Sequence, residues 1–600
     1  MSDLTRARIT RARWAAPLII SLVTIVAFLP ALGDGFVSWD DERNFLTNPH
    51  YRGLALDNLR WMWTTFHLGH YVPLSWMTLG LDYELWGMNA AGYHATSLLL
   101  HAANAVLVFV LARRLLALSQ PDAGDESLTW PAAVAALLFA VHPLRVESVV
   151  WITERRDVLS LFFYLLTVLA YVRDRRWTSV ILFACALLSK ATAMTLPALL
   201  FVLDVYPLSR VQFAGRRVNG LADAAIRLAP HALLSLASVV LSIVALRPPD
   251  QLGLAGKVAV SVYSLRFYVQ KTLVPRGLSP LYEMPQHVRP GAMVFVASGI
   301  TCMAITLAAW RYRHRFPGVL MAWLAFVIIS LPMLGVVQNG PQIAADRYTY
   351  HAAPALAMLV AGVLFALVRP AALARGIGTG LIAILAMLTW RQSHVWHDSQ
   401  SLWAHALEVD DTSSLAHSAM ASLLYKEDHV DEAMQHSVRA VQLAPGFAEA
   451  HNDVGVGLAR QGRNEEAAAS YRRALELKPT YDEAENNLGV VLVGKGDLAG
   501  AVEHYRRALE INEDNADAHV NWGNVLVRQQ QMDDAIAHYQ AALVIRPDLA
   551  DARHNWGVAL ALQGKLAEAI GQFRMALALN PNHAEAREFL ERATRMLQQR

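Results

Sequence analysis

Two adjacent carboxylates, Asp40 and Asp41, are the residues of this chain best suited to acid–base chemistry. They follow Trp39 in a long polar loop between residues 33 and 92, and a carboxylate can act as the general base that takes a proton from an attacking hydroxyl. Four further tryptophans lie in this loop: Trp61, Trp63, Trp76 and Trp86. Such rings can stack on the apolar face of a sugar. The plainer interpretation is an aromatic belt at a membrane surface beside solvated acids.

Further charged residues gather in short polar islands at the ends of apolar runs. The residues of interest are Glu147, Arg156, Asp157, Lys190, Asp346, Arg347 and Tyr348. Ionisable groups at bilayer depth are costly, and they are functional candidates for that reason. The cations can hold a phosphate, and the acids can deprotonate a hydroxyl. A single lysine or arginine of this kind is more often a membrane anchor, but several islands on one predicted side favour a site.

The composition predicts that membrane-spanning helices position these charged groups. Of 600 residues, 54% are hydrophobic and 17% are charged, and the net charge is +2. A soluble chain averages about 25% charged residues, so the composition predicts a membrane protein. The small net charge gives no reason to expect a nucleic-acid partner, whereas a lipid bilayer is expected as one.

Apolar runs between residues 14 and 390 are long enough to cross a bilayer as helices. We predict eleven spans: 14–32, 93–112, 131–150, 158–172, 177–189, 191–206, 228–246, 291–310, 317–337, 350–368 and 373–390. A twelfth run, 258–274, contains Arg266 and Lys271 and is predicted to be interfacial or re-entrant. Four arginines precede the first span and place the N-terminus in the cytoplasm. Alternation then places the acidic loop, the polar islands and the C-terminal region outside.

From residue 412 the sequence repeats with a period of 34. The repeating columns are Pro445, Pro479, Pro547 and Pro581; Gly455, Gly489, Gly523 and Gly557; and Tyr471, Tyr505, Tyr539 and Phe573. Two helices per repeat, small residues at close helix contacts and a proline after the second helix are typical of tetratricopeptide (TPR) repeats. Such repeats stack into a solenoid with a concave binding groove.

The predicted fold is therefore all-α, with a polytopic membrane region followed by a TPR α-solenoid. The predicted divisions are a cytoplasmic tail (1–13), a membrane domain (14–396), a linker (397–411), five TPR repeats of which the first is degenerate (412–581), and a capping helix (582–600).

One polar position recurs in four repeats and forms a ladder along one surface: Asp453, Asn487, Asn521 and Asn555. An asparagine amide can donate to a backbone carbonyl and accept from a backbone N–H, so the ladder can hold an extended peptide. The pattern is similar to the asparagine ladder in the repeats of soluble O-GlcNAc transferases. The alternative is that asparagine is merely tolerated at this helix position.

Taken in order, the motifs resemble a family. They are Trp39-Asp40-Asp41, Gly92-Tyr93-His94, His142-Pro143 with Glu147, Arg156-Asp157, Leu188-Ser189-Lys190 and Asp346-Arg347-Tyr348-Thr349-Tyr350. This order resembles the GT-C membrane glycosyltransferases fused to TPR repeats, known in animals as the transmembrane-and-TPR O-mannosyltransferases. The resemblance covers nearly the whole chain. Ala191 departs from it, because animal members tend to have glutamate after the lysine.

The resemblance implies a mechanism. GT-C enzymes take a sugar from a polyprenyl phosphate and transfer it with inversion, using an aspartate of the first outer loop as base. Mannose is a candidate for the sugar here. By motif, that base is Asp40 or Asp41, and Glu147 and Asp157 form a second acidic site. Arg156, Lys190 and Arg347, with Asp346 and Tyr348, bind the lipid-phosphate donor. Some GT-C enzymes use a divalent metal ion and others do not, so we assign no metal ligands.

The partners expected on this basis are a polyprenyl-phosphate-linked sugar and a protein or peptide captured by the TPR groove. The expected location is a bacterial inner membrane, with the solenoid on the periplasmic or extracellular side. One alternative is a non-catalytic, membrane-anchored TPR scaffold for envelope proteins. A second alternative, a transporter or flippase, predicts internal repeats in the membrane half and charges near the middle of the bilayer.

Overall fold

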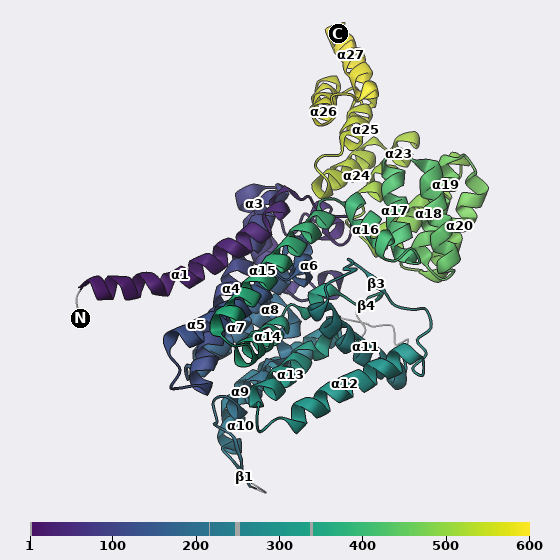
Figure 1. Cartoon of the computed structure of the whole chain (residues 1–600). Helices are drawn as coiled ribbons and strands as arrows, with labels where there is room; N and C mark the ends of the chain where they lie inside the picture. Colours follow the sequence, from purple (N-terminus) through teal and green to yellow (C-terminus); the bar gives the residue numbers. More distant parts are fainter. Residues whose placement is uncertain (1–2, 215–216, 246–251, 336–339, 600) are drawn as a thin grey trace. The chain divides into compact units, whose positions relative to one another are not determined.

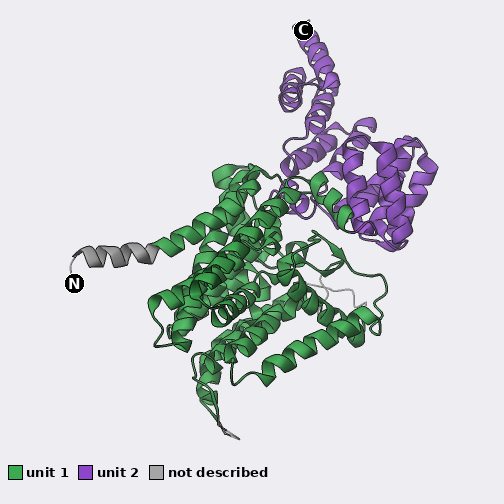
Figure 2. Cartoon of the chain, viewed as in Figure 1, with its two compact units in different colours: residues 1–37, 50–409 green, residues 38–49, 410–600 purple. Residues whose placement is uncertain are grey.

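The computed structural model describes residues 3–214, 217–245, 252–335 and 340–599. The side chains of residues 3–14, 214 and 217, including the four arginines that predict a cytoplasmic tail, lie outside the described part. The chain forms two compact units (Figure 2). Unit 1 comprises Met1–Val37 and His50–Val409, and unit 2 comprises Ser38–Pro49 and Asp410–Arg600. The loop segment with Asp40 and Asp41 therefore groups with the C-terminal unit, although its flanks belong to unit 1.

Unit 1 is a bundle of helices, whose colours run from purple through teal to green in Figure 1. Its helices are α1 (Asp3–Ala27), α2 (Leu56–Thr64), α3 (Pro73–Trp86), α4 (Ala90–Ser119), α5 (Asp125–Ala140), α6 (Val146–Val150), α7 (Arg155–Val172), α8 (Arg176–Ser189), α9 (Leu196–Val205), α10 (Leu221–Ala245), α11 (Leu254–Leu273), α12 (Met293–Arg311), α13 (Pro317–Ser330), α14 (Ala353–Leu367), α15 (Ala371–Ser393) and α16 (Ser399–Val409). Each predicted apolar run overlaps one of these helices.

Within the described ranges, four helical segments are long and apolar enough to cross a membrane: Ala90–Ser119, Leu221–Ala245, Met293–Arg311 and Ala371–Trp396. A fifth span results if α5 and residues 143–150, which meet at a 56° bend, are counted together. The prediction of eleven spans is therefore not confirmed. Several other runs form shorter apolar helices, and short 3₁₀ turns such as Ala191–Thr195 interrupt the α-helical hydrogen bonding between them.

Two further details concern the strands and the predicted linker. The fold is not purely helical, because β1 (Gln212–Ala214) pairs with β2 (Arg217–Asn219), and β3 (Tyr282–Glu283) pairs with β4 (Gln342–Ala344), both antiparallel. The predicted linker 397–411 contains helix α16, whose Leu402, Trp403 and Ala406 are buried at helical spacing. Burial of this apolar stripe stabilises the helix.

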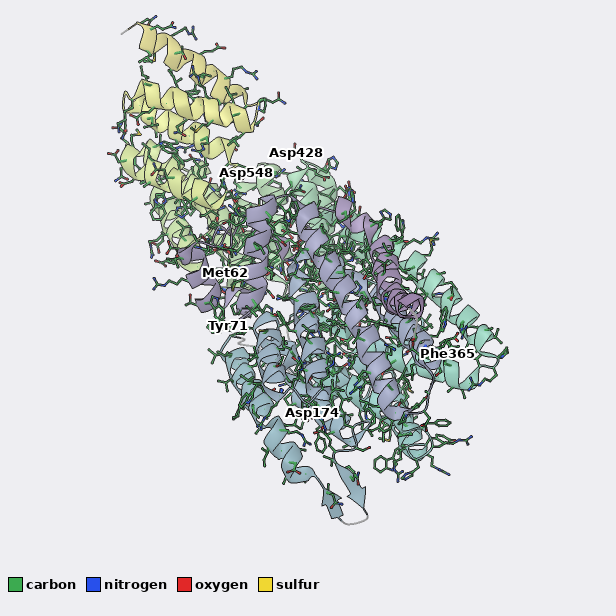
Figure 3. All side chains as sticks on the ribbon, turned by 90° about the vertical axis from the view of Figure 1, so that its left-hand side faces the viewer. Met62, Tyr71, Asp174, Phe365, Asp428 and Asp548 are labelled. Carbon is green, nitrogen blue, oxygen red and sulfur yellow. The ribbon has the colours of Figure 1, made fainter. Side chains whose placement is uncertain are left out.

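Unit 2 contains five successive helix pairs and a last helix. The pairs are α17 (Ser414–Lys426) with α18 (Val430–Leu443), α19 (Ala448–Arg460) with α20 (Asn464–Leu477), α21 (Asp482–Gly494) with α22 (Leu498–Ile511), α23 (Ala516–Arg528) with α24 (Met532–Ile545), and α25 (Ala550–Leu562) with α26 (Leu566–Leu579); α27 (Ala584–Gln598) follows. Figure 3 marks two connecting turns, at Asp428 after α17 and Asp548 before α25.

Close packing explains why a glycine and an aromatic residue recur at the same spacing within these helix pairs. A Cβ atom on Gly489 would lie 2.6 Å from the ring of Tyr505, and one on Gly523 would lie 2.6 Å from the ring of Tyr539. Both tyrosines are buried. Glycine therefore lets the second helix of each repeat lay its aromatic ring directly on the backbone of the first.

Candidate functional site

Unit 1 contains a buried group of charged side chains with Glu154 at its centre, which is fully buried. Arg156 donates two hydrogen bonds to its carboxylate, at 2.8 and 3.2 Å. Lys190 Nζ lies 2.6 Å from Glu154 Oε2, and Arg347 Nε lies 3.3 Å from Oε1. One carboxylate thus binds three cations, the most distant of which, Arg347, lies 193 residues away in the sequence. We call Glu147, Glu154, Arg156, Asp157, Lys190 and Arg347 the Glu154 cluster.

Two predicted acidic residues complete this cluster. Glu147 accepts the backbone N–H of Arg347 at 2.7 Å and forms an ion pair with its guanidinium. Asp157 accepts from Lys190 Nζ at 2.9 Å and from Ser148 Oγ at 3.1 Å. Glu147 and Asp157 are both buried. The structure therefore brings together five of the residues that the sequence singled out.

Local breaks in the helices position these groups. The chain leaves α6, makes a 3₁₀ turn over Ile152–Glu154 and enters α7, whose first turn carries Arg156 and Asp157. Lys190 caps the C-terminus of α8, which packs against α7. Arg347 lies in another 3₁₀ turn, Asp346–Thr349. Helix ends and short turns, rather than helix middles, therefore supply the cluster.

The charges of the cluster compensate one another. Burial acts to raise the pKa of Glu154, but Arg156 and Lys190 outweigh it and hold the pKa well below its usual range. Glu154 is therefore ionised at neutral pH. The three cations face Glu147, Glu154 and Asp157, and burial raises the pKa of Asp157 to about 7. Guanidinium and ammonium groups bind anionic oxygens through charge-assisted hydrogen bonds, so the cluster has the chemistry to bind one.

Asp346 and Tyr348 lie at the border of the cluster. Tyr282 of β3 donates to Asp346 Oδ1 at 3.0 Å, and Gln342 of β4 donates to Tyr348 Oη at 2.7 Å. Burial, with the nearby charge of Glu147, raises the pKa of Asp346 to about 8. The Arg347 guanidinium lies 5.0 Å from the centre of the Tyr348 ring. The small β3–β4 sheet therefore holds the turn that carries Arg347.

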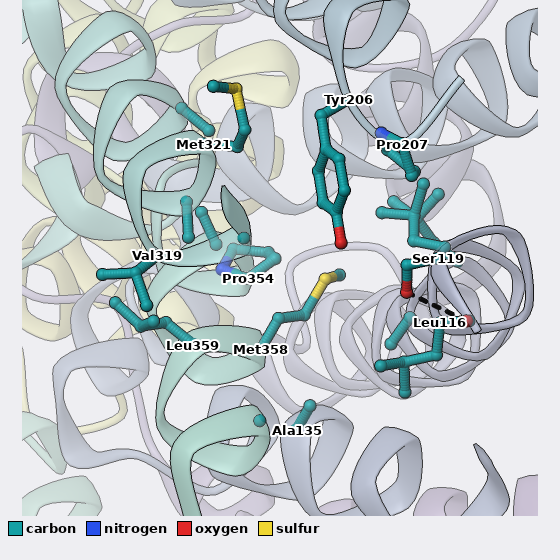
Figure 4. Close-up of a pocket in the computed structure, with 18 of the residues that line it drawn as sticks. Leu116, Ser119, Ala135, Tyr206, Pro207, Val319, Met321, Pro354, Met358 and Leu359 are labelled. Atoms are coloured by element: carbon teal, nitrogen blue, oxygen red, sulfur yellow. Dashed lines mark hydrogen bonds between the residues drawn. The ribbon is translucent and has the colours of Figure 1, made fainter. Parts of the chain in front are cut away.

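A largely apolar cavity of about 600 Å³ lies in the same unit (Figure 4). Helices α4, α5, α7, α9, α13 and α14 line it, and Figure 4 shows Tyr206 and Met358 pointing into it. His351 is among its lining residues; its Nε2 lies 3.1 Å from Ser160 Oγ, and its Nδ1 lies 3.7 Å from Asp157 Oδ1. His351 therefore links the apolar cavity to the Glu154 cluster.

Three features of unit 1 were not predicted from the sequence. Glu154 begins a run of four successive charged residues, 154–157, and such a run in so apolar a chain is a usable signal. His351 follows directly after the Asp346–Tyr350 motif. The third is a pair in unit 1, where buried Asp34 lies 3.2 Å from the half-exposed His397. Burial raises the pKa of Asp34 to about 6. No sequence pattern indicated this last pair, because 363 residues separate its members.

The predicted bases lie in unit 2. Asp41 is buried and precedes a π-helical turn, Glu42–Leu46, and the carbonyl of Asp40 accepts the backbone N–H of Asn44 at 2.9 Å. Their predicted catalytic role stays a prediction. Across the described residues, no group of three or more His, Cys, Asp and Glu side chains is arranged to hold a metal ion.

The predicted ladder joins neighbouring repeats. Asn487 Nδ2 donates to Asn452 Oδ1 at 3.0 Å, and Asn521 Nδ2 donates to Asn486 Oδ1 at 2.9 Å. Asn555 and Asp453 also bond across the repeat boundary, to Asn524 at 3.0 Å and to Ser418. These contacts give the ladder a structural role, which leaves its predicted role in peptide binding untested.

Comparisons with known proteins identify the class of the C-terminal region first. A family described as TPR repeat matches residues 458–496, 491–530 and 523–564, and one described as Tetratricopeptide repeat matches 550–583. The solved structure of YrrB, a TPR protein with an unusual peptide-binding site, is 24% identical, with a TM-score of 0.24, over 31% of this chain and 96% of that chain. The C-terminal helices are TPR repeats.

Curated relatives that match different shares of the chain are named protein O-mannosyl-transferases. Protein O-mannosyl-transferase Tmtc1 of Drosophila melanogaster is 36% identical over 31% of this chain and 22% of its own length. Protein O-mannosyl-transferase F38B6.6 of Caenorhabditis elegans is 22% identical over 72% of this chain and 63% of its own length. The matched regions thus span less than two thirds of these relatives. The resemblance to the transmembrane-and-TPR O-mannosyltransferases is confirmed.

Proposed function

We propose that this protein is a membrane glycosyltransferase of the GT-C type, which moves a sugar from a polyprenyl phosphate to an exported polypeptide. The observation that carries the proposal is the Glu154 cluster with its link, through His351, to an apolar cavity. A lipid phosphate needs cations for its head and apolar volume for its tail. The relatives named as protein O-mannosyl-transferases support mannose as the first sugar to test.

In the proposed reaction, an acceptor hydroxyl attacks the anomeric carbon of the donor. Asp40 or Asp41 takes the hydroxyl proton as the new C–O bond forms. The bond from the anomeric carbon to the phosphate oxygen breaks with inversion, and polyprenyl phosphate leaves with the electron pair. Arg156, Lys190 and Arg347 stabilise the negative charge that develops on the leaving phosphate. Glu154 orients these three cations before substrate arrives.

The solenoid is proposed to capture the acceptor. TPR repeats with an amide ladder can hold an extended peptide through its backbone, which raises the local concentration of acceptor. Because the acceptor is an exported chain in this proposal, the solenoid lies outside the cytoplasm and the N-terminus lies inside, in a bacterial inner membrane.

The test uses the purified full-length protein in detergent with polyprenyl phosphate carrying radiolabelled mannose and a polypeptide acceptor. Asp40→Asn or Asp41→Asn should lower transfer by about 10²–10⁴-fold, as removal of a general base does. Arg156→Gln should raise the KM for the lipid donor about tenfold, because a charge-assisted hydrogen bond to phosphate is lost.

Asp57→Asn is the matched control, because Asp57 is an exposed acid of the same loop, in the first turn of α2. Its activity should equal that of the wild type. Full transfer by both the Asp40 and Asp41 variants would remove the assigned base. Failure to use mannose or any other sugar on a polyprenyl phosphate would remove the proposed function.

A further inference from the structure

The loop segment Ser38–Pro49 belongs to unit 2, together with the TPR repeats. It is folded locally around the turn Glu42–Leu46, where Thr47 donates through both its backbone N–H and its hydroxyl to the carbonyl of Glu42, at 2.9 and 3.0 Å. Asp41, Phe45 and Asn48 are almost fully buried. The segment is therefore an ordered part of the solenoid unit.

Two neighbouring residues of opposite charge tie this segment to two different repeats. Lys426, in the last turn of α17, donates to Glu42 at 3.1 Å. Glu483, in the first turn of α21, accepts from Arg43 at 3.4 Å. We call these two ion pairs the clasp. Since α17 and α21 are the first helices of the first and third repeats, the clasp spans the repeat between them.

The clasp lies beside the beginning of the asparagine ladder. Glu483 interacts electrostatically both with Arg43 and with Asp453, the first member of the ladder. Tyr481, which is buried at the start of the same helix, interacts with the same two residues. One end of the ladder surface is thus next to a segment of the protein itself.

We infer that the first three repeats form a docking surface for the chain's own segment 38–49, and that docking positions the loop that carries Asp40 and Asp41. The inference rests on the proposed function for the catalytic meaning of this loop, but not for the docking. This inference assigns different functions to different repeats: the first three bind the loop, and the ladder toward Asn521 and Asn555 binds an acceptor. The solenoid then positions the loop of the proposed base in addition to binding the acceptor.

Cross-linking tests the docking without any substrate. The two free cysteines, Cys185 and Cys302, are first replaced by serine. Cysteines at Arg43 and Glu483 should then be joined by a short bismaleimide in the full-length protein. The control pair joins Arg43 with Asp548, in the turn before the fifth repeat, and should not react. Absence of the first product, or equal yields for both pairs, would overturn the inference.

Charge reversal tests the Arg43–Glu483 pair of the clasp, with cysteines now at the exposed positions Glu42 and Lys426 as reporters. Arg43→Glu or Glu483→Arg should lower the cross-link yield about fivefold, since an exposed ion pair is lost and like charges then face each other. The double reversal should restore the yield. Arg463→Glu, which breaks an exposed pair with Glu466 on α20, should have no effect. Unchanged yields in both single variants would show that the Arg43–Glu483 pair does not hold the segment.

Kinetic measurements distinguish a role of the clasp in positioning the loop from a role in binding the acceptor. With the radiolabelled lipid donor, Arg43→Glu should lower kcat for a long acceptor and for a peptide of a few residues alike, and Glu483→Arg added to it should restore kcat. A rise in KM for the long acceptor alone would assign the clasp to capture and overturn the positioning role. Cross-linking without any sugar transfer would refute the proposed function and leave the docking intact.

Discussion

The two units use ionic groups in opposite ways. In unit 1 the charged side chains of the Glu154 cluster are buried and bonded to several partners each. In unit 2 pairs such as Arg473–Glu476 lie on a helix surface with more than half of each side chain exposed. Desolvation makes the first kind costly to disturb, whereas water screens the second kind. The same ion-pair chemistry therefore indicates a site in one unit and a solvated surface in the other.

The largest expected effect comes from Glu154→Gln, which removes the shared partner of three buried cations. We expect a loss of about 3–5 kcal/mol in the free energy of unfolding, because uncompensated buried charge remains. The measurement is the midpoint temperature for loss of monodisperse full-length protein in detergent.

Two controls accompany this variant. Asp204 is also fully buried and accepts from Tyr171 at 2.6 Å and Arg210 at 3.1 Å, so Asp204→Asn should destabilise unit 1 comparably. Glu126 is 71% exposed and pairs only at the surface with Arg375, so Glu126→Gln should change little. If Glu154→Gln behaves like Glu126→Gln, the contrast between the units fails.

A smaller effect is expected from Gly523→Ala in the solenoid. The new methyl group would lie 2.6 Å from the ring of Tyr539, so the helix pair α23–α24 must separate. Overpacking of this kind costs about 1–3 kcal/mol. Hydrogen exchange of the α23 and α24 amides should become faster, whereas Gly571→Ala, where a methyl group meets no atom within 4 Å, should leave exchange unchanged.

Asp453→Asn tests a buried acid of unit 2. The carboxylate of Asp453 accepts hydrogen bonds from two neutral hydroxyl groups, those of Ser418 and Ser422. Burial raises the pKa of Asp453 to about 7. Between the unfolded value, 3.8, and 7, the folded state holds a proton that the unfolded state has lost, so stability falls as pH rises through this range.

The asparagine variant should therefore be more stable than the wild type at pH 8, by at least about 1 kcal/mol, and the gain should shrink toward pH 5. Exchange protection of α19 at the two pH values is the measurement. The other ladder positions already carry asparagine, which makes the replacement structurally conservative. An equal gain at both pH values would assign the effect to something other than the carboxyl.

The smallest effect is expected from Glu476→Gln, which breaks the exposed pair with Arg473. Helix-surface pairs of this spacing contribute about 0.3 kcal/mol. Exchange in α20 should remain within experimental error of the wild type, and high salt should not alter that result. A loss comparable to that of Glu154→Gln would contradict the comparison.

Much of the fold followed from local patterns. Apolar runs predicted the helices of unit 1, and the 34-residue columns predicted the helix pairs of unit 2, because helical spacing and repeat packing are encoded within a few dozen residues. The number of membrane spans could not be predicted from the sequence as well. A run such as 131–150 contains enough apolar residues for one straight helix, yet Pro143 breaks it into two helices that meet at 56°.

The amino-acid sequence specifies which residues are available for chemistry. Charges are so scarce in the apolar half that Glu147, Asp157, Lys190 and Arg347 stood out by type and place. The association of Glu154 with these residues, and of segment 38–49 with the repeats, is visible only in the packed structure. Contacts such as Arg347–Glu147 and Arg43–Glu483 connect residues 200 and 440 positions apart. No local pattern records such a contact, because it exists only once the helices have packed.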